Sequence, residues 1–65
     1  MSDFRPKVVA ILRENGCRFD RQGKGDHEIW HSPITDKKFP VDQKIRSRHT
    51  ANEIMKQAGL PKAFS

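Results

Sequence analysis

Hydrophobic residues near the N-terminus recur at helical spacing. Four of them would share one face of a helix: Phe4, Val8, Ile11 and Leu12. Pro6 suits a first helical turn, where its missing N–H would be unpaired anyway. Asn15-Gly16 suits the end of a helix, because Gly readily adopts the left-handed conformation. The pattern predicts a helix between these two signals, with Asp3 as a candidate N-cap.

The segment after Gly16 alternates between apolar and polar residues, which is typical of a strand. Cys17 and Phe19 would lie on one side of a half-buried strand over residues 17–22. The next four residues, 23–26, contain two glycines and an Asp, which tolerate positive φ. They therefore predict a hairpin turn.

Two further strands follow this turn. The first runs from His27 to about Ser32, with Ile29 and Trp30 on opposite faces. A turn signal over residues 32–36 leads to a third strand over residues 37–41. Pro40 cannot donate a hydrogen bond to a neighbouring strand, so the third strand is predicted either to lie at a sheet edge or to turn the Pro40 nitrogen towards solvent.

The C-terminal third predicts a polar loop and a second helix. The loop, residues 42–49, holds three cations two positions apart, which an extended backbone would present together: Lys44, Arg46 and Arg48. Thr50 and Glu53 fit a capping box, so the helix is predicted to start at Ala51. Its apolar stripe comprises Ala51, Ile54, Met55 and Ala58. Gly59 and Pro61 mark its end.

The predicted order is helix, three antiparallel strands, helix. Both helices need cover for their apolar stripes, and one face of the sheet is the only large surface available. The sequence therefore predicts a two-layer α+β domain with both helices on one face of the sheet. A single domain is expected over residues 1–65, because a chain of this length has room for only one.

The composition indicates a cellular compartment and a class of binding partner. The lone Cys17 cannot form an internal disulfide, which is typical of a reducing, cytoplasmic protein. The longest apolar run, residues 8–12, is far shorter than the roughly 20 residues of a membrane span, so no membrane association is expected. The net charge of +5 favours polyanionic partners, nucleic acid first. A surface made basic for solubility alone is the competing interpretation.

His27 is the candidate catalytic residue. An imidazole exchanges protons near neutral pH, and RNA carries its own nucleophile in the 2′-OH, so a single His between cations could cleave it. On pattern alone, the favoured interpretation of His27 is an ordinary polar residue that starts an exposed strand, and only the family resemblance given below reverses that preference. The candidate RNA-binding residues are Arg21, Lys24, Gly25, Lys44, Arg46 and Arg48.

Trp30 has two interpretations, because it could stack on an unpaired base or pack in the core. The other histidines, His31 and His49, are dispersed in the sequence. Together with Cys17 they show no metal-ligand spacing, so no metal or other cofactor is expected.

The helix-strand-strand-strand-helix order resembles the double-stranded RNA-binding fold. Three motifs together resemble the HicA toxins of bacterial toxin-antitoxin pairs over about residues 7–60: Asn15-Gly16, Arg21-Gln22-x-x-Gly25-x-His27 and Ile54-x-x-Gln57-Ala58-Gly59-Leu60. The resemblance implies an endoribonuclease, or mRNA interferase, that cleaves mRNA and blocks growth. It also implies neutralisation by a HicB-type antitoxin, within a larger toxin-antitoxin assembly.

The family's catalytic His belongs to a Gly-Ser-His turn and carries over onto His27 alone. Asp26 occupies the position where Ser is usual, and a carboxylate beside an imidazole favours its protonated form. Two other functions remain open from the residues. The same fold and charge would suit a non-catalytic RNA-binding module, and the small size would suit an interaction subunit for an acidic protein.

Overall fold

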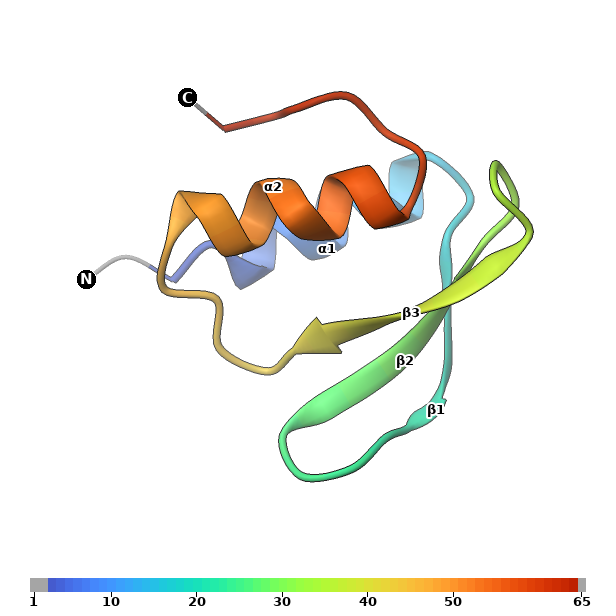
Figure 1. Ribbon diagram of the computed structural model, residues 1–65, viewed down its shortest axis with the longest axis horizontal. Helices are drawn as coiled ribbons and strands as arrows, with labels where there is room; N and C mark the ends of the chain where they lie inside the picture. Colours follow the sequence, from blue (N-terminus) through green and yellow to red (C-terminus); the bar gives the residue numbers. More distant parts are fainter. Residues whose placement is uncertain (1–2, 65) are drawn as a thin grey trace.

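Two helices and a three-stranded antiparallel sheet make up the computed structural model, which describes residues 3–64. The elements in chain order are α1 (Arg5–Glu14), β1 (Arg18–Gln22), β2 (His27–Ser32), β3 (Lys37–Asp42) and α2 (Arg48–Gln57). Helix α1 packs against α2, and α2 packs on β3. Figure 1 shows both helices on one side of the sheet. The predicted α+β layout, that of the double-stranded RNA-binding fold, is confirmed.

The sheet has the order β1-β2-β3, so β2 is central and the Pro40-containing β3 is an edge strand, as predicted. Trp30 of β2 lies opposite Phe39 of β3, and both side chains are buried against the helices. Because side chains alternate along a strand, His27, Ile29 and His31 face the other way. This second surface, which no helix covers, is called the open face below.

The core lies between the helices and the sheet. Its buried residues are Val8, Leu12, Cys17, Trp30, Phe39, Val41, Ile45, Ala51, Ile54, Met55 and Ala58. They include the whole predicted stripe of the second helix. Ile45 was missed, because it stands alone in a polar loop. Its carbonyl accepts a hydrogen bond from Phe4 N at 2.7 Å, which ties the loop to the start of α1.

The first strand differs from its prediction of half burial. All five residues of β1 are exposed, and Phe19 retains 50% of its surface. The physical reason is that β1 is an edge strand that neither helix covers. A bulge also interrupts it, since Phe19 pairs with Trp30 but Arg21, rather than Asp20, pairs with Ile29. The bulge places Arg21 on the open face.

The start of α2 also differs from its prediction. The N-cap is Ser47, whose Oγ accepts a hydrogen bond from Thr50 N at 3.1 Å. The capping box at Thr50 and Glu53 was therefore wrong, and the helix begins three residues before Ala51. Arg48 consequently lies in the first helical turn and not in an extended loop beside Lys44.

The predicted helix ends are confirmed. Gly59 has φ +83°, and Leu60 N donates to Met55 O at 2.8 Å, which is the pattern of a Schellman stop. At the start of α1 the N-cap is Phe4, one residue later than expected. Asp3 still accepts a hydrogen bond from Arg5 N at 3.0 Å through its carboxylate.

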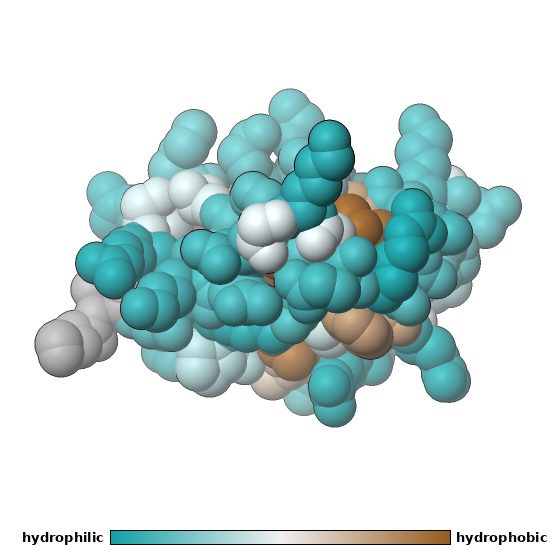
Figure 2. Space-filling view, turned by 90° about the horizontal axis from the view of Figure 1, so that it is seen from below, coloured by the Kyte–Doolittle hydropathy of each residue, from teal (hydrophilic) through white to brown (hydrophobic). Residues whose placement is uncertain are grey.

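The face of the molecule seen from below is mainly hydrophilic. Figure 2, which views the molecule from below Figure 1, shows only small, separate hydrophobic areas. Among residues 3–64, neither helix has the length and apolar character needed to cross a bilayer.

The N-cap assignment is testable by a pair of substitutions. Ser47→Ala should lower the free energy of unfolding by about 1 kcal/mol, the usual cost of losing a Ser cap. Thr50→Ala should cost less than half of that, because Thr50 lies inside the helix, where Ala has the better propensity. Urea unfolding measures both. A larger loss of stability from Thr50→Ala than from Ser47→Ala would show that Thr50 is the N-cap.

Candidate functional site

His27 begins β2 directly after the hairpin turn, with its side chain 53% exposed. The turn holds it closely, because His27 N donates to Lys24 O at 3.1 Å and Gly23 N donates to His27 O at 2.9 Å. Gly25 adopts φ +58°, which favours glycine at the tip. The predicted turn thus presents the imidazole to solvent.

Asp42, the last residue of β3, is the partner of His27. The two residues lie directly opposite each other in the β2–β3 register, and His27 Nδ1 is 2.7 Å from Asp42 Oδ1. With the Nδ1 proton directed at this carboxylate, Nε2 is left to exchange a proton with a ligand. Asp26 was expected to be the neighbouring carboxylate, but the carboxylate in contact with the ring is that of Asp42.

Asp42 was missed by the sequence analysis, although a signal for it existed. The turn between β2 and β3 occupies residues 33–36, and Ser32 pairs with Lys37. Counting back from this pair places Asp42 opposite His27. Asp42 was interpreted as the first residue of a loop, so it was not expected to pair with His27.

A surface hollow of about 450 Å³ lies beside the imidazole. Its lining residues are Asp26, His27, Asp42, Gln43 and Lys44. Gln43 N donates to Asp26 O at 2.9 Å, which joins the hairpin turn to the loop before α2. This link explains how Lys44, 17 positions away in the sequence, comes to share a hollow with His27.

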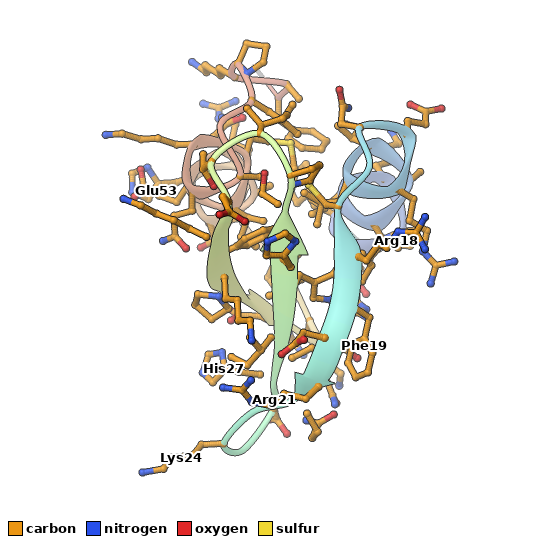
Figure 3. The ribbon with its side chains drawn as sticks, turned by 90° about the vertical axis from the view of Figure 1, so that its right-hand side faces the viewer. Arg18, Phe19, Arg21, Lys24, His27 and Glu53 are labelled. Carbon is orange, nitrogen blue, oxygen red and sulfur yellow. The ribbon has the colours of Figure 1, made fainter. Side chains whose placement is uncertain are left out.

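The other predicted cations are distributed around this end of the molecule. Figure 3 shows Arg21 and His27 at the same end of the sheet, with Lys24 beyond them at the hairpin tip. Arg21 Nη1 is paired with Asp20 Oδ2 at 2.8 Å, and Lys38 Nζ approaches the same carboxylate at 3.3 Å. These are exposed pairs, which contribute little to stability.

Arg46 and Arg48 do not join the hollow. Arg46 lies close enough to Asp3 for its charge to help lower the pKa of that carboxyl, after the larger effects of hydrogen bonds from Arg5 N and Ile45 N. Arg48 is the first residue of α2. The structure therefore brings Lys44 to the hollow beside His27 and places Arg21 and Lys24 on the hairpin at the same end of the sheet. Arg46 and Arg48 are not among the residues that line the hollow.

Arg5 supports the site from the helix side of the sheet. Its Nη1 donates to Asp42 O at 2.9 Å, and its Nη2 donates to Glu28 Oε1 at 2.8 Å. Trp30 Nε1 donates to the same Glu28 oxygen at 3.1 Å. Through these bonds α1 holds the ends of β2 and β3 that carry His27 and Asp42.

Trp30 is 1% exposed, so of its two interpretations, stacking on RNA and packing in the core, the core role is the one that holds. A second imidazole-carboxylate pair lies further along the open face, where His31 Nε2 is 3.1 Å from Asp36 Oδ1. Within residues 3–64, no three His, Cys, Asp or Glu side chains are grouped as a metal site requires.

Comparison with known protein families identifies the group to which this site belongs. The family model described as HicA toxin of bacterial toxin-antitoxin matches residues 5–60, which is most of the chain. The chain belongs to the HicA toxin family. Comparisons with curated proteins and with solved structures give no significant match.

Membership of the HicA toxin family has two direct consequences. The chain is the toxin of a toxin-antitoxin pair, and a cognate antitoxin is the partner that the family implies. The match covers the hairpin, His27, Asp42 and both helices, so every element of the site described above lies within the HicA region.

The hydrogen bonds that Arg5 and Trp30 donate to Glu28 predict a pH dependence of stability. Burial raises the pKa of Glu28, but hydrogen bonds from Arg5 and Trp30, together with the charge of Arg5, outweigh burial and bring this pKa below its ordinary value of 4.5. A depressed folded-state pKa stabilises the protein above the ordinary value, and this contribution is lost as the pH falls through the folded-state pKa. The free energy of unfolding should therefore decrease below about pH 4.5.

Glu28→Gln should make that decrease shallower, since it removes the ionisable group. Arg5→Met should have the same effect, because it removes the main hydrogen-bond donor and the charge. The double variant should add nothing further if the two residues act as a unit. Urea unfolding between pH 3 and pH 7 measures all four proteins, and an unchanged slope in Glu28→Gln would refute the assignment.

Proposed function

We propose that this HicA toxin is an endoribonuclease that cleaves mRNA with His27 as its catalytic residue. The observation that carries the proposal is the half-exposed imidazole, with Nδ1 at 2.7 Å from Asp42, at a hollow shared with Lys44. An oriented imidazole beside a cation is the minimum equipment for acid-base cleavage of a phosphodiester.

The reaction would use the substrate's own 2′-OH as nucleophile. This oxygen attacks the adjacent phosphorus, and the bond to the departing 5′ oxygen breaks. His27 Nε2 accepts the proton of the 2′-OH or donates a proton to the departing oxygen, while Asp42 holds the ring in place. RNA contacts are proposed at six positions: Arg21, Lys24, Gly25, Lys44, Arg46 and Arg48. Such a step requires no metal ion.

Replacement of His27 tests this mechanism. His27→Ala should reduce cleavage of a defined mRNA fragment at least about 100-fold in the presence of EDTA, because positioned acid-base groups contribute about 10²- to 10⁴-fold. RNA affinity should change little, since the cations are retained. His31→Ala is the matched control, because His31 lies on the same strand and face and has its own carboxylate partner.

Undiminished cleavage by His27→Ala would remove this residue from the mechanism. Stable RNA binding without cleavage by the wild-type protein would favour a non-catalytic RNA-binding module of the same fold. Asp42→Asn separates orientation from binding. It should lower kcat, because the amide no longer accepts the Nδ1 proton of His27 as the carboxylate does. The RNA dissociation constant should not rise, because the change removes a negative charge from the hollow.

We further propose that the cognate antitoxin is of the HicB type and neutralises the toxin by covering the open face and the His27 hollow. A protein seated there would exclude RNA from the imidazole and from Lys44 together. It would also support a domain with a thin core, within a larger hetero-oligomer.

Hydrogen exchange of the toxin-antitoxin complex tests this placement. Amides of residues 23–28 and 41–45 should become protected when the antitoxin binds. The exposed end of α2, around Lys56 and Gln57, serves as the internal reference and should exchange as in the free toxin. Protection confined to the two helices would contradict the proposal.

A further inference from the structure

A second hollow lies at the outer edge of β1, away from His27. Its volume is about 370 Å³, and its lining residues are Arg13, Gly16, Cys17, Arg18, Phe19 and Trp30. Figure 3 shows Arg18 and Phe19 projecting from this edge, on the opposite side of the sheet from His27. The described residues contain two exposed large hydrophobic side chains, Phe19 and Ile34, and only Phe19 lines this hollow.

Phe19 is fixed in place by the residue beneath it. Its ring packs edge-to-face on Trp30, with centroids 6.4 Å apart and planes at 84°. Trp30 is itself buried, and the guanidinium of Arg13 lies 5.8 Å from its ring centroid. Trp30 is thus a support rather than a stacking surface. The aromatic ring that this pair presents to solvent is that of Phe19.

The surroundings of Phe19 favour a nucleic acid over a protein strand. Its neighbours along β1 are Arg18 on one side and the bulge at Asp20 on the other. A bulge breaks the regular ladder that a partner strand would extend. An isolated aromatic ring in a hollow lined by Arg13 and Arg18 is also a poor match for an extended apolar interface. It matches a flat base attached to a phosphate.

We propose that this hollow binds an unpaired nucleobase of the RNA substrate, stacked on Phe19, with its phosphate near Arg18. The inference rests on the proposed ribonuclease function and adds a second contact point to it. Base-aromatic stacking is tolerant of sequence, because every base has a π-face. The base must be unpaired, since duplex bases are stacked on one another and closed to side chains.

The sheet offers a path from this hollow to His27. His27 lies on β2, the strand next to β1, three residues along from Trp30, the partner of Phe19. The two positions are therefore roughly 5 Å apart across the strands and about 10 Å apart along them. Phe19 shares the helix side of the sheet with Trp30, so a strand that reaches both sites passes around the β1 edge to the open face. Arg21 occupies the open face of β1, between Phe19 and the hairpin turn. A single RNA strand crossing this end of the sheet would place one base on Phe19 and a phosphate several bonds away at His27.

Fluorescence provides a local readout, because Trp30 is the only tryptophan of the chain and lines the hollow. The probe is a six-nucleotide oligoadenylate, titrated into His27→Ala protein so that no cleavage occurs. Binding should change the emission of Trp30. Phe19→Ala should raise the dissociation constant about 5- to 150-fold, the range expected for loss of one stacked base.

Two further variants make the test specific. Ile34→Ala removes an equally exposed hydrophobic side chain outside the hollow, so it should leave the dissociation constant unchanged. Phe19→Leu keeps an apolar contact with Trp30 but lacks the ring, so it should bind as weakly as Phe19→Ala while melting at a temperature near that of the parent. The same oligonucleotide paired with its complement should not change the Trp30 emission.

Several outcomes would overturn the inference. Oligoadenylate binding, measured by fluorescence polarisation, with unchanged Trp30 emission and no effect of Phe19→Ala would remove the base site. Loss of antitoxin affinity in Phe19→Ala with unchanged RNA affinity would assign the hollow to the protein partner. A wild-type toxin that binds RNA with the expected Trp30 signal but fails to cleave it would instead overturn only the ribonuclease proposal.

Discussion

The pairing of β2 with β3 is the constraint on which the site depends. This pairing sets the residues of the two strands opposite one another from Ser32 and Lys37 to His27 and Asp42. One face of the pair supplies Trp30, Phe39 and Val41 to the core, so a slip of β3 by one residue would turn Phe39 and Val41 away from Trp30 and the helices. Burial of these side chains therefore also fixes the contact between the imidazole and its carboxylate on the opposite face.

The helices extend this constraint to the ends of the strands. Arg5 connects α1 to both Glu28 and the carbonyl of Asp42. On the other side of the hairpin, the bond from Gln43 N to Asp26 O joins the turn to the loop before α2. The catalytic candidate thus lies on a short strand whose position is set by contacts from three other segments. This arrangement compensates for the small core of a 65-residue chain.

Most of the fold was predictable from local pattern. The apolar stripes of both helices, the Gly-containing turn and the Pro40 edge strand follow from residue types at short range. The start of α2 could not be predicted in this way, because both Ser47 and Thr50 can cap a helix. The buried Ile45 in the preceding loop favours the earlier start. The exposure of β1 also depends on tertiary packing, since no local feature of residues 18–22 indicates that the helices stop short of them.

The site was predictable in part. His27 and its turn were predicted from residue type and family resemblance, whereas the position of Asp42 beside His27 follows only from the register of β2 and β3. The positions of Arg46 and Arg48 depended on where α2 begins, so the error in the cap carried over to them. Trp30 could not be assigned from sequence, because an aromatic residue on a strand suits both a core and an RNA surface. Its burial and the exposure of Phe19 follow from which strand is central.

The bulge in β1 adds one residue to the strand and so changes which side chains lie beside Ile29. At the bulge, two residues of β1, Asp20 and Arg21, lie opposite a single residue of β2, Ile29. Deletion of either residue would restore strict alternation beyond Phe19. The residue that remains would then stand next to Ile29, a cation if Asp20 is deleted and an anion if Arg21 is deleted, while Gln22 would stay opposite Glu28. The bulge thus keeps an anion and a cation paired on the face that carries the imidazole, and a chain with either residue deleted would present a single uncompensated charge there on the same fold.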